Sequence, residues 1–344
     1  MSKPVLINDW HPVAASAALA PGTVLAEKLM DHELAIWRSA DGTVSIWEDR
    51  CPHRGSRFSI GRIENDGVTC AYHGWRFAAD GQCVHLPAQP DFKPSANMKA
   101  RVYHAKERYG LVWACIGDPA SGQTPDLLPF PEYDDANLRK VLCGPYDVGC
   151  SGPRIVENFL DMAHFGFVHT GILGDADHTA MRDYKVEMFD DGAGAGHANA
   201  GVLATQCFAW QPQTNSLSHG GSDVEYTYRV VRPLTAILTK LPEKQADFRE
   251  AISLHIQPVT EESSRAWIIL AMTNFVQSDD ELRDFQDRIF LQDKPILENQ
   301  VPRRLPLTRD AEIHMGWDRM SVAYRRYLVE RGMDYGVIHQ SMTA

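Results

Sequence analysis

The stretch Cys51-Pro52-His53-Arg54-Gly55 and the later stretch Cys70-Ala71-Tyr72-His73-Gly74 decide how the first part of this chain folds. Each stretch pairs one cysteine with one histidine and ends on a glycine that favours a tight turn. A cluster of two irons can take two thiolates on one iron and two imidazoles on the other, and the neutral imidazoles raise its reduction potential. The two stretches therefore predict an electron-transferring [2Fe-2S] cluster. The predicted ligands are Cys51, His53, Cys70 and His73.

A zinc site with two cysteines and two histidines is the alternative interpretation of these four residues. Structural zinc sites usually take each pair of like ligands from one short loop. Here each loop supplies one cysteine and one histidine. The flanking stretch Gly74-Trp75-Arg76-Phe77 suits two tight loops that meet over a buried metal. We therefore favour an iron–sulfur cluster over zinc, and over no metal at all.

The composition is that of an ordinary globular protein with two domains. The chain has 344 residues, of which 44% are hydrophobic and 23% are charged. The formal net charge of −11 disfavours nucleic acids and anionic membranes as partners, because their phosphates bind basic surfaces. The sequence contains neither a membrane-spanning apolar run nor the apolar core of a signal peptide, so we expect a cytoplasmic protein. The remaining cysteines are expected to be buried free thiols: Cys83, Cys115, Cys143, Cys150 and Cys207.

Short runs of β-forming residues, separated by turn residues, predict an all-β first domain over residues 1–118. Asp41-Gly42 is a strong hairpin signal between two alternating runs, and Asp80-Gly81 is a second signal of the same kind. Tyr109-Gly110 separates two further runs. The expected strands include residues 23–29, 34–38, 43–48, 101–106 and 111–116.

The composition changes over residues 119–140, which are rich in proline and predict a linker. Residues 141–344 mix helical and strand patterns, so we expect an α+β domain. Ser278 and Glu281 form the pattern of a capping box at the start of a long helix. The expected elements are helices over residues 154–167, 279–300 and 320–331, with several strands between residues 184 and 275.

A second candidate metal site lies in the segment from Glu157 to His169. Asn158, Asp161 and His164 recur every three residues, and polar groups on an otherwise apolar helix are costly unless something satisfies them. His164 and His169 are five residues apart, about 140° around a regular helix, so both reach one ion only if the helix bulges or ends near Gly166. A cluster that delivers electrons needs a destination, and this favours a metal at the two histidines.

Two histidines and one carboxylate form the facial triad of non-haem Fe(II) oxygenases, which leaves positions open for O2 and water. The spacing of the residues does not settle which carboxylate completes the triad. Glu157 is too distant, about 10 Å from His164 along a helix axis, whereas Asp161 is only about 4.5 Å away. Asp293, which lies among apolar residues shortly before Pro295, is the distant candidate.

The two cluster stretches resemble those of the Rieske non-haem iron aromatic oxygenases. The segment Asn158-x-x-Asp161-x-x-His164-x4-His169 is similar to the mononuclear iron motif of that family, and Gln292-Asp293-Lys294-Pro295 is similar to the setting of its late carboxylate ligand. Domain order and domain lengths extend the resemblance over nearly the whole chain. The size and the closing segment from Asp318 to Tyr327 look most like the branch of vanillate O-demethylase and dicamba monooxygenase.

The resemblance implies an N-terminal Rieske β-domain and a catalytic helix-grip domain with an antiparallel sheet and a long helix, assembled as a head-to-tail homotrimer. It implies that His164, His169 and Asp293 hold Fe(II), and that Asp161 joins His164 to the cluster ligand His73 of the neighbouring subunit. The sequence has no dinucleotide fingerprint such as GxGxxG. Electrons from NAD(P)H would therefore enter through a separate flavin and [2Fe-2S] reductase or through a ferredoxin.

These features predict a terminal oxygenase that uses O2 to hydroxylate or oxidatively demethylate a small aromatic compound. Ring dihydroxylation by the same iron site is the alternative, as is an electron carrier without oxygenase activity. Iron content separates an oxygenase of either kind from an electron carrier, because an oxygenase holds about three irons per chain and a carrier about two. The pocket candidates are Phe159, Phe165, His255, Phe285 and Ile289, with Asn158 as a further candidate beside the ligands. Residues of these types are more often plain core than pocket lining.

Overall fold

The computed structural model describes residues 5–64, 66–117, 126–189, 200–218, 220–245, 247–308 and 310–339. The chain divides into two compact units, one formed by Ile7–Asp126 and the other by Met1–Leu6 with Leu127–Ala344. Residues 118–125, which include the first seven residues of the predicted linker, lie outside the described residues. Helix α1 (Pro131–Asp134) and the first residues of strand β11 (Arg139–Val148) lie in the remainder of the predicted linker. The exact domain boundaries stay a prediction.

The first unit consists of two antiparallel sheets. The larger sheet has six strands in the order β1-β10-β9-β4-β3-β2, and the smaller has four in the order β5-β6-β7-β8. The predicted hairpin at Asp41-Gly42 is confirmed, since it connects β3 to β4. The strands are β1 (His11–Ala15), β2 (Val24–Leu29), β3 (His32–Arg38), β4 (Val44–Glu48), β5 (Arg62–Glu64), β6 (Gly67–Thr69), β7 (Arg76–Ala78), β8 (Cys83–His85), β9 (Val102–Arg108) and β10 (Leu111–Cys115), with a 3-10 turn at Ser16–Ala18.

A fully buried group of aromatic side chains forms the core beneath the two cysteine loops. The Trp47 ring packs edge to face against Trp37 and Phe58, with centroid distances of 5.3 Å in both pairs. Phe58 in turn packs edge to face against Phe77 at 5.2 Å. Aromatic pairs of this kind contribute about 0.5–1.5 kcal/mol each beyond their buried area. Cys51 and Cys70 belong to the same buried cluster, so the core fixes the two cysteine positions.

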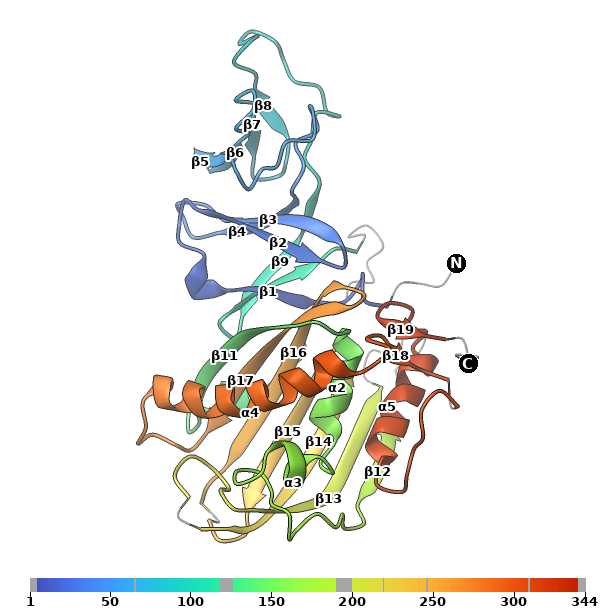
Figure 1. The fold of residues 1–344 in the computed structure, drawn as a ribbon. Coiled ribbons are helices and arrows are strands. Elements are labelled where there is room, and N and C mark those ends of the chain that lie inside the picture. Colours follow the sequence, from blue (N-terminus) through green and yellow to red (C-terminus); the bar gives the residue numbers. More distant parts are fainter. Residues whose placement is uncertain are drawn as a thin grey trace. The chain divides into compact units, whose positions relative to one another are not determined.

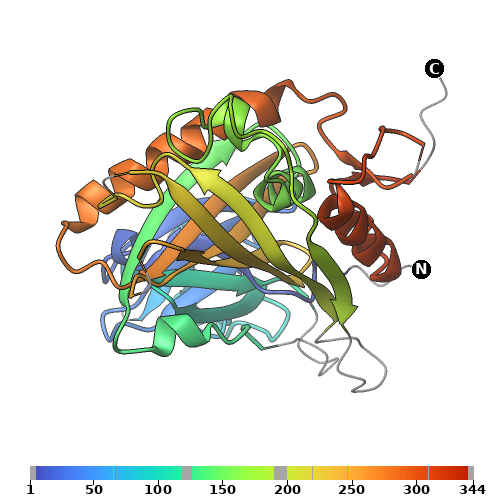
Figure 2. The same cartoon turned by 90° about the horizontal axis from the view of Figure 1, so that it is seen from below.

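The second unit is built on a seven-stranded antiparallel sheet in the order β11-β17-β16-β15-β14-β13-β12. Helices α2 (Gly152–Leu160) and α4 (Asp279–Asn299) lie along this curved sheet, and α5 (Arg319–Glu330) packs beside β12 and β13 (Figures 1 and 2). The expected α+β class is confirmed. The other elements are α3 (Phe165–Val168), β12 (Lys185–Phe189), β13 (Gly201–Gln211), β14 (Ser222–Arg232), β15 (Thr235–Pro242), β16 (Glu250–Thr260), β17 (Ser263–Met272), β18 (Leu305–Pro306) and β19 (Val337–Ile338).

Helix α4 begins at the predicted capping box. The Ser278 hydroxyl accepts a hydrogen bond from the Glu281 N–H at 3.2 Å, and the Glu281 carboxylate accepts one from the Ser278 N–H at 2.7 Å. The buried residues of this helix recur at helical spacing and form one stripe, which carries Asp293 inward: Leu282, Gln286, Phe290, Asp293 and Leu297. Among the helices of the described ranges, none is long and apolar enough to cross a membrane.

The helix predicted over residues 154–167 is interrupted, and this is a correction to the sequence-based expectation. Helix α2 ends at Leu160, and Asp161 has extended backbone angles, with φ −89° and ψ 130°. The Asp161 carboxylate accepts a hydrogen bond from the Ala163 N–H at 2.7 Å. Such a local bond competes with helical hydrogen bonding, which explains why the chain turns here. The single turn α3 then begins after His164 and ends before His169.

Candidate functional site

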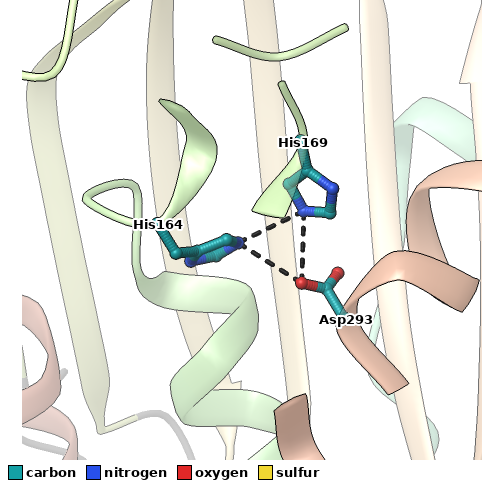
Figure 3. A group of neighbouring side chains, drawn as sticks. All are labelled: His164, His169 and Asp293. Carbon is teal, nitrogen blue, oxygen red and sulfur yellow. Dashed lines mark hydrogen bonds and ion pairs between the residues drawn. The ribbon is translucent and has the colours of Figure 1, made fainter. Parts of the chain in front are cut away.

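Three side chains from two distant segments converge in the second unit. The Nε2 atoms of His164 and His169 lie 3.2 Å apart, and the Asp293 Oδ1 atom lies 3.4 Å and 3.1 Å from them, respectively (Figure 3). One ligand atom from each of the three residues lies within 4.8 Å of the other two. The three residues therefore form a group that could hold a metal ion. His169 and Asp293 are buried, and His164 is nearly so. The structure therefore brings all three predicted ligands together.

The break between α2 and α3 is what allows the two histidines to meet. On a continuous helix they would point about 140° apart, but His164 and His169 instead flank the single turn of α3. The turn is held closely against the following loop, because a Cβ atom at Gly166 would lie 2.7 Å from the Asp175 carbonyl oxygen. A side chain at Gly166 would therefore push the histidine turn away from its support.

Hydrogen bonds on the far side of each imidazole fix its orientation. Asp161 Oδ2 lies 3.2 Å from His164 Nδ1, and Gln292 Oε1 lies 2.9 Å from His169 Nδ1. Both oxygens are acceptors, so each Nδ1 carries the proton and each Nε2 lone pair points at the shared centre. The role of Gln292 was not predicted, although its position next to Asp293 in the sequence was the available signal.

The charges at this site suit a divalent cation. Burial lowers the pKa of His164, but the hydrogen bonds that its ring donates to the Asp161 and Asp293 carboxylates outweigh burial and raise that pKa to about 9. The two carboxylates therefore favour a positive charge at this point. Burial raises the pKa of Asp293, but the two histidines outweigh it and hold the pKa below its ordinary value. Two imidazole nitrogens and one carboxylate oxygen facing one point are the donor set that Fe(II) takes in facial triads. The residues present fit that metal.

The two cysteine loops of the first unit have the same backbone turn. The Cys51 N–H donates to the Ser56 carbonyl at 2.8 Å, and the Cys70 N–H donates to the Trp75 carbonyl at 2.9 Å. In each loop the glycine N–H also donates a hydrogen bond to the cysteine carbonyl, at 2.9 Å for Gly55 and 3.0 Å for Gly74. Both glycines have a positive φ, +71° and +68°, which only glycine adopts without strain.

These loops place two thiols and two imidazoles so that they fit a mixed-ligand [2Fe-2S] cluster. The rings of His53 and His73 lie 4.5 Å apart, and Trp75 stacks on His53 at 4.2 Å. Burial, with a smaller contribution from the neighbouring Cys70 thiol, raises the pKa of Cys51 to about 12. A buried thiol of this kind loses its proton readily only to a metal, which supplies the missing positive charge.

A largely apolar pocket opens beside the triad within the second unit. It encloses about 680 Å³, its open mouth included, and all three triad residues are among those that line it. Most of its wall comes from apolar side chains of α2, α4 and the sheet, for example Ile155, Leu238, Ile252, Leu254, Ile268 and Phe290.

Three of the predicted pocket residues, Phe159, Phe165 and Ile289, line this pocket, and so does Asn158. Asn158 donates from Nδ2 to Asp293 Oδ1 at 3.4 Å. The structure places His255 and Phe285 elsewhere, which corrects the expectation for both.

His255 lies on the face of β16 opposite to its pocket-lining neighbour Leu254, because successive residues of a strand point to opposite faces. Its Nε2 atom is 2.8 Å from the Ser253 hydroxyl, and burial lowers its pKa to about 3. Phe285 is half-buried on α4 and packs under the Arg288 guanidinium at 5.4 Å. Among the lining residues that sequence reasoning missed, four carry polar groups: Tyr226, Tyr228, Lys240 and Gln286.

Comparison with known protein families gives two matches. A profile of the Rieske [2Fe-2S] domain matches residues 9–102. A profile of the vanillate O-demethylase oxygenase C-terminal domain matches residues 148–332. Together the two matches include every predicted ligand of the cluster and of the triad.

Relatives cover nearly the whole chain. A probable methylxanthine N7-demethylase, NdmC, from Pseudomonas sp. (strain TJI-51) is 33% identical over 96% of this chain and 96% of its own length. The methylxanthine N1-demethylase NdmA of Pseudomonas putida is 27% identical over 94% of this chain and 91% of its own length. The solved structure of Pseudomonas putida CBB5 NdmA with caffeine has a TM-score of 0.79 at 26% identity, covering 95% of this chain and 91% of that one. Dicamba monooxygenase bound to dicamba has a TM-score of 0.75 at 22% identity, with coverages of 96% and 98%, and it shows the shared fold.

Proposed function

Because the chain belongs to the Rieske non-haem iron oxygenases, and is a terminal oxygenase of that family, we propose that it removes a methyl group from a small, neutral, N-methylated heteroaromatic compound. The observation that carries this proposal is the convergence of His164, His169 and Asp293 on the wall of a mostly apolar pocket. A methyl group bound in this pocket would lie next to the metal position. The names of the relatives support the N-methylated class, since they are demethylases of methylxanthines at N7, N1 and N3.

The iron and the cluster, when bound, supply O2 activation and electrons, and the protein supplies position and surroundings. We propose that Asp161 and Gln292 keep the two imidazoles in the tautomer whose Nε2 atoms face the metal. The apolar side chains around the pocket, such as Phe159 and Ile289, would exclude water and hold a flat ring. Hydroxylation of an N-methyl carbon gives an unstable N-hydroxymethyl group, which releases formaldehyde and leaves N–H.

Electron delivery requires partners, because a Rieske oxygenase works with a reductase component. We propose a flavin and [2Fe-2S] reductase or a ferredoxin as the donor to this chain. A segment of the oxidoreductase NdmD of Pseudomonas putida is 34% identical to this chain over 133 residues, or 22% of NdmD. We further propose a head-to-tail homotrimer in which Asp161 joins His164 to His73 of the partner subunit. The partly exposed carboxylate of Asp161 and the exposed imidazole of His73 support this arrangement, since both groups are accessible at the surface of their own unit.

The proposal is tested by turnover with caffeine, theobromine and theophylline in the presence of NADH and a Rieske reductase. We expect O2-dependent release of formaldehyde in equal amount to the demethylated xanthine. Labelled O2 should place one oxygen atom in the formaldehyde, with correction for exchange with water. A product carrying two new ring hydroxyl groups would instead support dihydroxylation. Turnover of methoxybenzoates with no turnover of any N-methylated ring would contradict the proposal.

A further inference from the structure

One charged side chain in the wall of the pocket has no part in the iron site. Lys240 lies on β15, and its side chain is only 5% exposed. Its ammonium group lies 2.9 Å from the carboxylate of Glu250, whose side chain is 9% exposed. Glu250 is the direct cross-strand neighbour of Lys240 on β16. The pair is therefore buried in the sheet beneath the substrate pocket.

The neighbours of Lys240 show that it stays charged and keeps donors free. Burial lowers the pKa of Lys240, but the Glu250 carboxylate outweighs burial and holds the pKa above its ordinary value. An ammonium group has three N–H donors. Among the described residues, Glu250 is the partner of the Lys240 side chain. The hydroxyl oxygen of Tyr226, its neighbour on β14, accepts a hydrogen bond from the side-chain amide of Gln211. Donors of Lys240 therefore remain for a molecule in the pocket.

Gln286 provides a second polar group in the wall of this pocket. It is a buried residue of α4, seven positions before Asp293 on the same inward stripe, or about 10 Å along the helix axis. The pocket therefore offers hydrogen-bond donors away from the metal as well as apolar walls.

A buried ion pair contributes little to stability, because the desolvation of both charges offsets their attraction. An ion pair in the wall of a binding pocket can instead serve recognition, since it presents a charged hydrogen-bond donor while the local net charge stays at zero. We propose that Lys240, neutralised by Glu250, donates a hydrogen bond to a carbonyl oxygen of a neutral heteroaromatic substrate and thereby selects against carboxylated rings. This inference rests on the proposed function and names the feature that the substrate must carry.

The selectivity follows from the charges in the pocket. A neutral carbonyl accepts a hydrogen bond from the ammonium while Glu250 remains its counter-ion. A carboxylate on the substrate would add a second negative charge next to Glu250 in a poorly solvated place, and like charges so close are strongly unfavourable. Substrates with ring carbonyls are therefore accepted, and benzoate-like substrates are disfavoured.

The test is anaerobic calorimetric titration of the iron-loaded protein with caffeine and with 4-methoxybenzoate, so that binding is measured without turnover. Removal of Lys240 alone would leave Glu250 buried and unpaired, so the variant to use is Lys240→Met/Glu250→Leu, which removes both charges. We expect its Kd for caffeine to rise about 10- to 100-fold, the range for a lost hydrogen bond to a charged group. The matched control, Lys185→Met/Glu187→Leu on β12, changes two exposed residues and should bind caffeine like the wild type.

A second variant separates recognition from a merely structural role. Glu250→Gln leaves the Lys240 ammonium without its counter-ion. We expect 4-methoxybenzoate to bind this variant at least about 10-fold more tightly than it binds the wild type, while caffeine binding changes less. A structural defect would weaken the binding of both ligands.

The outcomes distinguish this inference from the proposed function. Unchanged caffeine affinity in the double variant, or equal losses for both ligands in Glu250→Gln, would overturn the role of Lys240. So would a wild-type protein that binds neither ligand, or that binds 4-methoxybenzoate as tightly as caffeine. Binding of caffeine that depends on Lys240 but leads to no formaldehyde would support the recognition site and contradict the proposed reaction.

Discussion

The two candidate iron sites of this chain are built in opposite ways. The cluster site takes its four candidate ligands from two short loops with the same hydrogen-bonded turn, supported by one aromatic core. The triad takes its two histidines from a broken helix and its carboxylate, Asp293, from α4. Gln292, the residue before Asp293, lies 123 positions after His169 in the sequence. Local turns are visible in a sequence, whereas long-range convergence depends on how a whole sheet and two helices pack.

The first prediction has the largest expected effect and concerns the triad, whose ligands come from distant parts of the sequence. Asp293→Ala removes the carboxylate that lies 3.1 Å from His169 Nε2, so we expect loss of the mononuclear iron and of all turnover. Metal analysis should fall from about three irons per chain to about two, and the visible spectrum of the cluster should stay unchanged. Asp284→Ala, on the exposed side of the same helix, is the control and should keep all the iron.

The second prediction separates holding the iron from using it. Asp161→Asn keeps an oxygen that can accept from the Ala163 N–H but removes the charge beside His164. We expect full iron content and a loss of turnover of about 100-fold or more, at the upper end of the range for groups that orient a metal ligand. Asp177→Asn at an exposed site is the control. Loss of the mononuclear iron in Asp161→Asn would show that the carboxylates of Asp161 and Asp293 have been assigned in the wrong order.

The third prediction concerns a residue that only the structure identifies. Gln292→Leu removes the acceptor 2.9 Å from His169 Nδ1 and frees the ring to rotate. We expect iron affinity to fall about 10- to 100-fold, measured by competition with a chelator. Gln292→Glu should restore most of the affinity, because a carboxylate also accepts from Nδ1. The exposed Leu291→Ala serves as control, and equal losses in both would contradict an orienting role for Gln292.

The fourth prediction has the smallest effect and compares the two cluster loops with each other. Gly55→Ala places a side chain at φ +71° in open space, and should lower the free energy of unfolding by about 1–2 kcal/mol. Gly74→Ala has the same strain and also brings a Cβ atom to 3.1 Å from Pro87 Cγ, so it should cost more. Thermal loss of the cluster's visible absorbance measures both. Equal midpoints for the two variants would mean that the Pro87 contact is not rigid.

The contrast between the two sites explains how much the sequence could predict. The cluster loops, the capping box at Ser278 and the pair of histidines were visible as local patterns. The break after Leu160 was not, because the hydrogen bond from Ala163 to Asp161 overrides a helical pattern that continues through it. The choice between Asp161 and Asp293 needed the position of α4, which spacing alone does not contain.

The pocket was predicted least well, since whether a residue lines it depends on which face of its strand or helix points into the pocket. His255 alternates with Leu254 on β16 and points to the other side of the sheet. Gln286, seven residues before Asp293, could have been found by following the inward stripe of α4 from the candidate ligand. Lys240 carried a weaker signal, as a lone charge in a short apolar strand.

The central claim is that a mononuclear ferrous ion, bound by His164, His169 and Asp293, lies beside the pocket. The most direct measurement is electron paramagnetic resonance of the anaerobically reduced protein after addition of nitric oxide. We expect an S = 3/2 signal of about one spin per chain, distinct from the cluster signal, that changes shape when the aromatic substrate is added. A reduced cluster without any S = 3/2 signal in the wild-type protein would contradict the account.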